Sequence, residues 1–103
     1  MSDKDIELEI QAKGLTAPRV TPADIEANIA SVEIVRFVSE SGQVLRWAVT
    51  TTQNGSSVVG KPSCAVSAAN DNKELGEKIA LDNSKEEIWP LMGYALKERL
   101  ASD

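Results

Sequence analysis

The stretch EIVRFVSESGQVLRWAVTTTQNGSSVVGK, residues 33–61, decides the fold. Apolar and polar residues alternate through most of it with a period of two, which is typical of strands with one buried face. Two turn signals divide it. Gly42 can take the left-handed position of a three-residue loop over 40–42, and Asn54-Gly55 predicts a type I′ hairpin turn with positive φ at both central positions. The stretch therefore predicts a three-stranded antiparallel meander.

The first loop also fixes how two of these strands pair. It sets Phe37 opposite Leu45 and Val35 opposite Trp47, so four apolar side chains share one face. Three further residues are expected on the same face: Val49, Thr51 and Val58. On this reasoning Trp47 is expected to anchor the core rather than to form a platform for a ligand.

A helix is expected before the meander. In TPADIEANIASV, Thr21 can cap the helix, Pro22 suits its first position, and Asp24 favours the helix N-terminus. These signals predict a helix over about 22–31, with an apolar face of Ile25, Ile29 and Val32. Residues 3–13 alternate with a period of two, which leaves a short half-buried strand and a loosely held terminal arm as alternatives.

A loop is expected over 61–72, followed by two more helices. The first would present a face of Leu75, Ile79, Ser84 and Ile88. Trp89 precedes a proline and is therefore steered away from helical geometry, while Pro90 fits best as the first residue of a new helix. We therefore expect two C-terminal helices in preference to one long kinked helix.

These elements together predict an α+β fold: an N-terminal helix, a three-stranded antiparallel meander, and two C-terminal helices packed on one sheet face. At 103 residues the chain is expected to form one small domain, over residues 21–101, preceded by an N-terminal arm or short strand over 1–20.

The C-terminal stretch EEIWPLMGYALKERL, residues 86–100, holds a tryptophan and the single tyrosine of a chain with few aromatic residues. Its aromatic side chains either hold the two helices against the sheet or meet another molecule. The candidate interaction or helix-docking surface consists of Trp89, Pro90, Met92 and Tyr94.

Composition argues against several functions. The net charge of −5 disfavours nucleic-acid binding, because the lysines and arginines are interspersed with acids. No apolar run is long enough for a membrane helix, and the start lacks the pattern of a signal peptide. The chain has no histidine, and its one cysteine, Cys64, is expected to be a small buried residue. We therefore expect a cytoplasmic protein that is not an enzyme, with no catalytic residue, cofactor or metal.

Several segments between residues 15 and 100 resemble a family of small proteins of unknown function from tailed phages and prophages. The family is typified by products of coliphage N-four and Shigella phage Sf-six. Its signature I-W-P-L-x-G-Y-x-L-(K/R)-x-(K/R)-L is matched by IWPLMGYALKERL, residues 88–100, and its G-x-K-I-A step by residues 76–80. Cys64 matches a cysteine familiar after the hairpin. The sequence departs from the family at Ser56, where an aromatic residue is common, and at Lys61, where an acid is common.

The resemblance implies a phage or prophage origin and the cytoplasm of a bacterial host, and it brings no established activity. The leading interpretation is a phage accessory protein that binds a host or phage protein of unknown identity, with a homodimer as a further expectation. The alternative is an acidic nucleic-acid mimic that blocks a host DNA- or RNA-binding protein. A mimic should carry its carboxylates in a one-sided stripe, whereas a general partner surface should be apolar with a polar rim.

Overall fold

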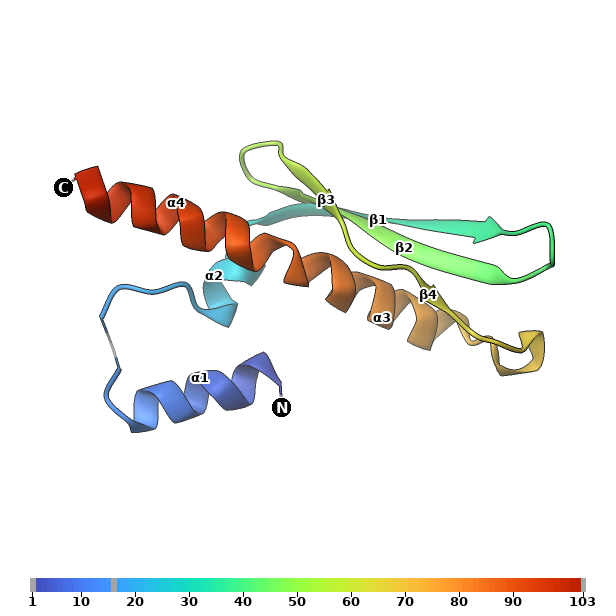
Figure 1. Ribbon diagram of the computed structural model, residues 1–103, viewed down its shortest axis with the longest axis horizontal. Coiled ribbons are helices and arrows are strands. Elements are labelled where there is room, and N and C mark those ends of the chain that lie inside the picture. The colour runs from blue at the N-terminus through green and yellow to red at the C-terminus, as the bar shows by residue number, and fades with distance from the viewer. Residues whose placement is uncertain (1, 16, 103) are drawn as a thin grey trace.

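The computed structural model describes residues 2–15 and 17–102 and shows an antiparallel sheet with a long helix along one of its faces (Figure 1). The expected α+β fold class is confirmed. In chain order the elements are α1 (Asp3–Ala12), α2 (Pro22–Ala27), β1 (Ile29–Val38), β2 (Val44–Thr52), β3 (Ser57–Val59), β4 (Ser63–Cys64), the 3-10 helix η1 (Ala68–Asn70), α3 (Lys73–Glu86) and α4 (Ile88–Ser102).

The strands β1, β2 and β3 form the expected meander, and β4 adds a short second pairing to β2. The predicted register is confirmed, with Phe37 opposite Leu45 and Val35 opposite Trp47. The first loop is also as predicted. The N–H of Ser39 donates to the carbonyl of Gln43 at 2.9 Å, and the glycine of the loop has a φ of 89°.

The second hairpin lies where it was predicted, but its turn is of a different type. Only Gly55 has a positive φ, 88°, and no non-glycine residue does within the described part of the chain. The N–H of Thr52 donates to the carbonyl of Ser56 at 2.8 Å, which closes a three-residue loop. Asn54 contributes through its side chain, whose Oδ1 accepts from the Ser56 N–H at 3.0 Å. The type I′ expectation is therefore wrong, and both hairpins use the same three-residue turn.

The helix α3 covers the opposite face of the sheet from the one that was expected. The β2 residues on that covered face are buried: Arg46, Ala48, Thr50 and Thr52. Trp47 lies on the other face and is only half-buried, so its expected role as a core anchor is wrong. Val58 pairs with Thr50 and lies on the covered face, and Val59 takes the place that was predicted for it.

Small and polar residues make the contact between α3 and the sheet. Ala80 and Ser84 are fully buried there, whereas Leu75 and Ile79 are 57% and 42% exposed and do not form the expected helix face. Hydroxyl groups join the layers: Ser84 Oγ donates to the Val58 carbonyl at 3.2 Å, and Ser63 Oγ donates to the Gly76 carbonyl at 2.7 Å. The small side chains allow the helix axis to approach the strands closely.

The segment that follows β3 makes the closest approach to α3. A Cβ atom on Gly60 would lie 2.2 Å from the carbonyl carbon of Asn83, so only glycine fits at this point. The side chain of Asn83 then donates to the Lys61 carbonyl at 2.9 Å. The region expected to be a loop over 61–72 contains β4 and η1, because this contact and the pairing with β2 fix its path.

The N-terminal part differs from expectation in two ways. Residues 3–12 form a helix and not a strand, because Ser2 and Asp5 make a capping box and Lys13 pairs with Glu9 one turn earlier at 2.8 Å. The next helix, α2, has the predicted Thr21–Asp24 cap but ends at Ala27. Ile29 and Val32, which were assigned to its apolar face, belong to β1 instead.

The two C-terminal helices form one bent unit, with the break at Glu87 (Figure 1). Pro90 is the third residue of α4 and not the first, a position where its missing N–H would lack a helical partner in any case. The helix α3 lies on the sheet, and α4 continues its line past the sheet and contacts α2. Among the described residues, four apolar ones are buried: Ile25, Ala48, Ala80 and Ile88.

Candidate interaction surfaces

The face of the sheet opposite α3 carries a cluster of apolar side chains, which we call the open face: Val35, Phe37, Leu45, Trp47, Val49 and Val59. Phe37 is 53% exposed and Val59 is 51% exposed, although both are large apolar residues. The rings of Phe37 and Trp47 lie with centroids 6.3 Å apart at an interplanar angle of 41°, a tilted aromatic pair. Within the described residues no helix packs on this side.

Polar residues border one end of the open face. Glu33 pairs with Val49, and Thr51 pairs with Ser57 through hydroxyl groups 2.8 Å apart. An apolar centre with a polar border is the arrangement that distinguishes a partner surface from a solvated sheet face. Cys64 pairs with Leu45 in the strand register and is exposed, so the expectation that its thiol is buried is wrong.

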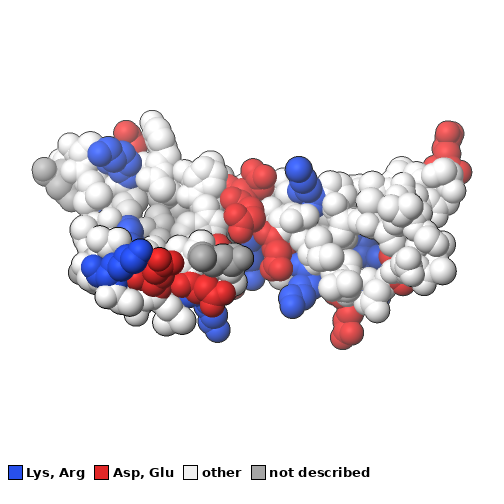
Figure 2. Space-filling view, turned by 60° about the horizontal axis from the view of Figure 1, so that its bottom comes forward, with Lys and Arg blue, Asp and Glu red and all other residues white. Residues whose placement is uncertain are grey.

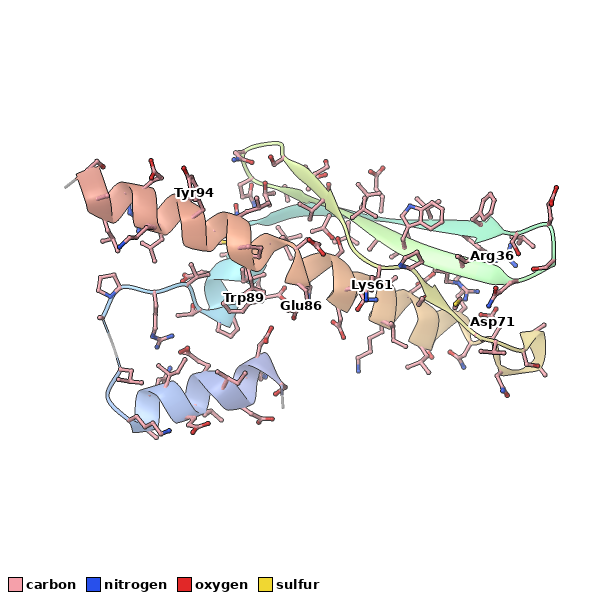
Figure 3. The ribbon with its side chains drawn as sticks, in the orientation of Figure 1. Arg36, Lys61, Asp71, Glu86, Trp89 and Tyr94 are labelled. Atoms are coloured by element: carbon pink, nitrogen blue, oxygen red, sulfur yellow. The ribbon has the colours of Figure 1, made fainter. Side chains whose placement is uncertain are left out.

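The structure does not bring the four C-terminal candidate residues together on one surface. Trp89 and Met92 are half-buried and face the N-terminal segment, whereas Pro90 and Tyr94 are exposed. Tyr94 is 69% exposed and points away from the side of α4 that carries Trp89 (Figure 3). A five-residue separation turns a helix by about 140° beyond a full turn, which explains the opposite directions.

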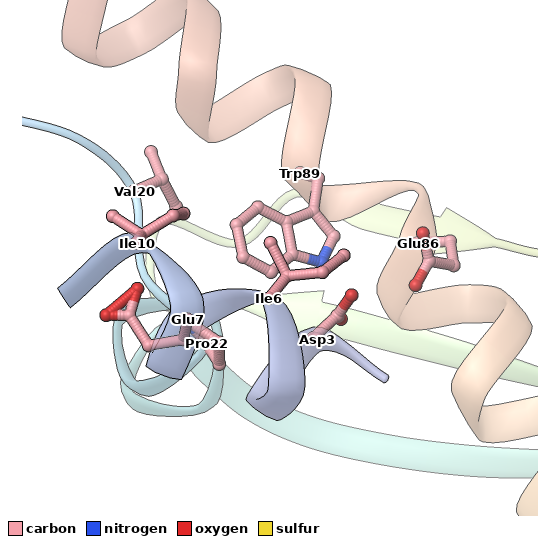
Figure 4. A pocket seen from close by; sticks show the side chains of 8 residues that line it. All are labelled: Asp3, Ile6, Glu7, Ile10, Val20, Pro22, Glu86 and Trp89. Atoms are coloured by element: carbon pink, nitrogen blue, oxygen red, sulfur yellow. The ribbon is translucent and has the colours of Figure 1, made fainter. Parts of the chain in front are cut away.

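Trp89 forms one wall of a hollow of about 200 Å³ between α1, α2 and the helix bend (Figure 4). Ile6, Ile10, Val20 and Pro22 form the rest of its apolar lining. Glu86 also lines the hollow, and its pKa is raised by desolvation and by the neighbouring charge of Asp3. Trp89 is thus a contact for the chain's own N-terminal helix.

An ion pair that was not predicted from the sequence lies under the N-terminal end of α3. Arg46 points inward from β2 and meets Asp71 with two hydrogen bonds, of 2.6 and 3.1 Å. The arginine side chain is 6% exposed. This hydrogen bond from Arg46 lowers the pKa of Asp71, and the same contact raises the pKa of Arg46.

The ion pair borders a hollow of about 300 Å³ that also includes Ser63, Leu75 and Ile79. Because each charge satisfies the other, neither is free to bind a charged ligand. The pair instead ties the segment before α3 to the sheet. Its sequence signal was weak, since Arg46 alternates with small residues on a face that was expected to meet solvent.

The surface charges do not form a single acidic stripe in the view of Figure 2. That view turns the lower side of Figure 1 forward, and on it the carboxylates lie in separate groups with lysines and arginines beside them. Within residues 2–15 and 17–102, no group of three or more potential ligands could hold a metal ion. None of the helices in this part of the chain combines the length and apolar character needed to cross a bilayer.

Comparison with known proteins gives one finding. No curated protein and no solved structure matches the chain. The family described as Phage protein (N4 Gp49/phage Sf6 gene 66) matches residues 20–100, a span from just before α2 to near the end of α4. The chain therefore belongs to the Phage protein (N4 Gp49/phage Sf6 gene 66) family and is a phage-associated protein.

Proposed function

We propose that this phage-associated protein is not an enzyme and that it acts by binding another protein through the open face of its sheet. The observation that carries the proposal is the uncovered aromatic pair of Phe37 and Trp47 at the centre of an apolar sheet face. Large aromatic residues in such a position supply most of the binding free energy in many interfaces.

The chemistry of the chain supports a binding role over catalysis. It has no histidine, and its single cysteine therefore lacks the usual base that would activate a thiol nucleophile. The buried guanidinium of Arg46 is engaged with the half-buried carboxylate of Asp71. The ionisable groups of the chain therefore have structural roles or face solvent.

The geometry favours a general partner surface over an acidic mimic of nucleic acid. A mimic presents carboxylates at the spacing of phosphates along one side of the molecule. The carboxylates visible in Figure 2 are interrupted by basic side chains. Between residues 31 and 37 of β1, the open face carries one charged side chain, Glu33, because Arg36 lies on the other face. The binding free energy should therefore come mainly from apolar contact and depend only weakly on salt.

The test is affinity capture from a lysate of infected or lysogenic host cells, with bound proteins identified by mass spectrometry. The wild-type chain, Phe37→Ser and Trp47→Ser are compared with Tyr94→Ser, which removes an exposed aromatic ring away from the open face. We expect a protein that the wild type and Tyr94→Ser retain and that each face variant retains about 30-fold less, the loss of about 2 kcal/mol typical of a hot spot.

Two results would contradict the proposal. Equal capture by the face variants and the wild type would show that the partner binds elsewhere. Recovery of no protein except the chain itself, from both infected and lysogenic lysates, would remove the case for a host or phage partner. Circular dichroism of each variant shows whether its fold is retained.

A further inference from the structure

The isolated chain has a larger accessible surface than a compact monomer of the same mass. Its accessible surface is 7221 Å² for a mass of 11.1 kDa, whereas a compact monomer of that mass exposes about 5,700 Å². Its radius of gyration is 16.5 Å, against about 13 Å for a compact domain of this length. The excess of about 1,500 Å² is as large as one partner's share of a substantial interface.

Part of this excess lies along the outer edge of β1. This strand pairs with β2 on one side, and no strand within the described residues pairs with its other side. The bond from Ser39 to Gln43 sets the alternation of the antiparallel ladder, so odd-numbered residues of β1 exchange hydrogen bonds with β2. Beyond the irregularity between Ile29 and Ser31, the even-numbered residues direct both N–H and C=O groups outward: Val32, Ile34, Arg36 and Val38.

The side chains of β1 are apolar and exposed on both faces of the sheet. Val32, Ile34 and Val38 are 40%, 37% and 46% exposed on the face that carries α3, and Phe37 is 53% exposed on the open face. A strand with apolar residues on both faces is typical of the interior of a sheet, whereas natural edge strands are short or carry lysine or proline. β1 has ten residues and contains neither lysine nor proline.

We infer that the free edge of β1 pairs with β1 of a second copy of the chain, antiparallel and about a two-fold axis perpendicular to the sheet. The result is one continuous sheet across both copies, with both α3 helices on one side and both open faces on the other. This inference goes beyond the proposed function and does not depend on it, because the open face stays free to bind a partner.

The charges of β1 restrict the register of this pairing. A two-fold axis perpendicular to the sheet keeps the side chains of both copies on the same faces. Residues that pair across the axis therefore have numbers that add to an even sum, and the register is centred on one residue that faces its own copy. Centring on Glu33 or on Arg36 would set like charges directly opposite each other, which is destabilising. The registers centred on Ile34 or on Val35 avoid both clashes. They also overlap residues 30–38 and residues 32–38 of the strand, respectively, so the edge is complementary to itself.

Sedimentation equilibrium tests the inference at micromolar and near-millimolar concentrations. We expect the wild type to reach twice the chain mass of 11.1 kDa. Ile34→Pro should stay at the mass of one chain with unchanged secondary structure, because it removes an outward N–H and no bond to β2. Trp47→Ser, on the open face, should associate like the wild type and thereby separates this test from that of the proposed function.

Cross-linking provides a second measurement that needs no disruption of the strand. Ile34→Cys and Val35→Cys are each made in a Cys64→Ser background, with Val59→Cys as the control on the far side of β2. Residues facing each other across the axis have Cα atoms about 4.5–5.5 Å apart, within disulfide range. One of the two edge variants should form a disulfide-linked dimer on oxidation, and the control should not.

Four results would overturn the inference. The wild type could remain at the mass of one chain at every concentration, or Ile34→Pro could associate as strongly as the wild type. A further contrary result would be that neither edge cysteine forms a disulfide-linked dimer at a concentration where the wild type is dimeric. If Trp47→Ser alone abolished association, the second copy would bind the open face instead of the edge of β1.

Discussion

The two sides of β2 are built on opposite principles. On the side of β3 and β4, α3 seals the sheet with small residues and with buried hydrogen bonds from Ser63 and Ser84. On the side of β1, large apolar side chains such as Phe37 stay exposed. We call the side of β3 and β4 the closed side, because it holds the chain together with little apolar area. We call the side of β1 the open side, because its apolar area stays accessible to other molecules. This difference in covering supports the proposal that the large apolar residues serve contacts beyond the chain.

We expect substitutions on the two sides to affect different properties of the chain. Substitutions on the closed side should change the free energy of unfolding, whereas substitutions on the open side should change association and leave unfolding of the isolated chain nearly unaltered.

Gly60→Ala should have the largest effect, because its Cβ would meet the backbone of Asn83, which cannot move away as a flexible side chain could. We expect a loss of about 3 kcal/mol in the free energy of unfolding, at the upper end for overpacking. Chemical denaturation measures it. Gly93→Ala in α4 is the control, since nothing lies within 4 Å of its added Cβ, and it should gain up to about 1 kcal/mol. Equal stability of the two variants would mean that the closed side is loosely packed.

Acid should weaken the closed side through the Arg46–Asp71 pair. Since the hydrogen bond with Arg46 lowers the pKa of Asp71 in the folded chain, the stabilisation is present above the unfolded pKa of about 3.9 and is lost as pH falls through the folded value. Melting temperatures of the wild type should therefore fall below about pH 4. Asp71→Asn should melt lower at neutral pH, by less than Gly60→Ala does, and should show a smaller acid loss.

The control for the acid prediction is Asp82→Asn, an exposed aspartate on α3 that is in no ion pair among the described residues. It should follow the wild-type melting curve across the pH range. An acid loss in Asp71→Asn as large as that of the wild type would assign the acid sensitivity to other carboxylates.

The two hairpin glycines allow the sides to be compared at equal local strain. Gly42 closes the β1–β2 turn and Gly55 closes the β2–β3 turn, with φ of 89° and 88° and no atom within 4 Å of an added Cβ in either case. Each Gly→Ala change should therefore lower stability by about 1–2 kcal/mol, the cost of a left-handed conformation for an L-residue. Denaturation of both variants checks the equality. A much larger loss for Gly55→Ala would show that folding of the closed side depends on its turn.

Thr50→Val should have the smallest effect and the opposite sign. The Thr50 hydroxyl is fully buried under α3 and has no hydrogen-bond partner in the described part of the chain. Replacing an unsatisfied hydroxyl by a methyl group of similar size removes a desolvation penalty, so we expect a gain of about 1 kcal/mol. The melting temperature reports the change. Thr51→Val, half-buried on the other face, is the control, and a loss of stability in Thr50→Val would indicate that its hydroxyl has a bound water.

Features set by local sequence could be predicted. The strand register follows from a short loop with Gly42 at its left-handed position, and the start of α2 follows from Thr21, Pro22 and Asp24. The α1 helix was not predicted, because the alternation of its apolar residues is typical of a strand. Its capping residues and its Glu9–Lys13 pair carried the correct signal.

The choice of sheet face and the buried ion pair could not be predicted. Alternation shows that two faces differ, and not which one a helix will cover. Here the decision depends on Ala80 and Ser84, small residues of a helix more than twenty positions away in the chain. Asp71 likewise stands 25 positions from Arg46, so no local pattern joins them. The open face, and with it the candidate interaction surface, follows from the same long-range decision.

The scarcity of buried apolar residues has a consequence for how stability changes with temperature. In the part of the chain that the structure describes, four apolar residues are buried, beside five polar or charged ones. Hydration of apolar groups raises the heat capacity on unfolding and hydration of polar groups lowers it, so the isolated chain should fall below the usual increment of about 12–15 cal/mol/K per residue. Its stability curve is therefore shallow and broad. The free energy of unfolding should therefore change little between low and physiological temperatures.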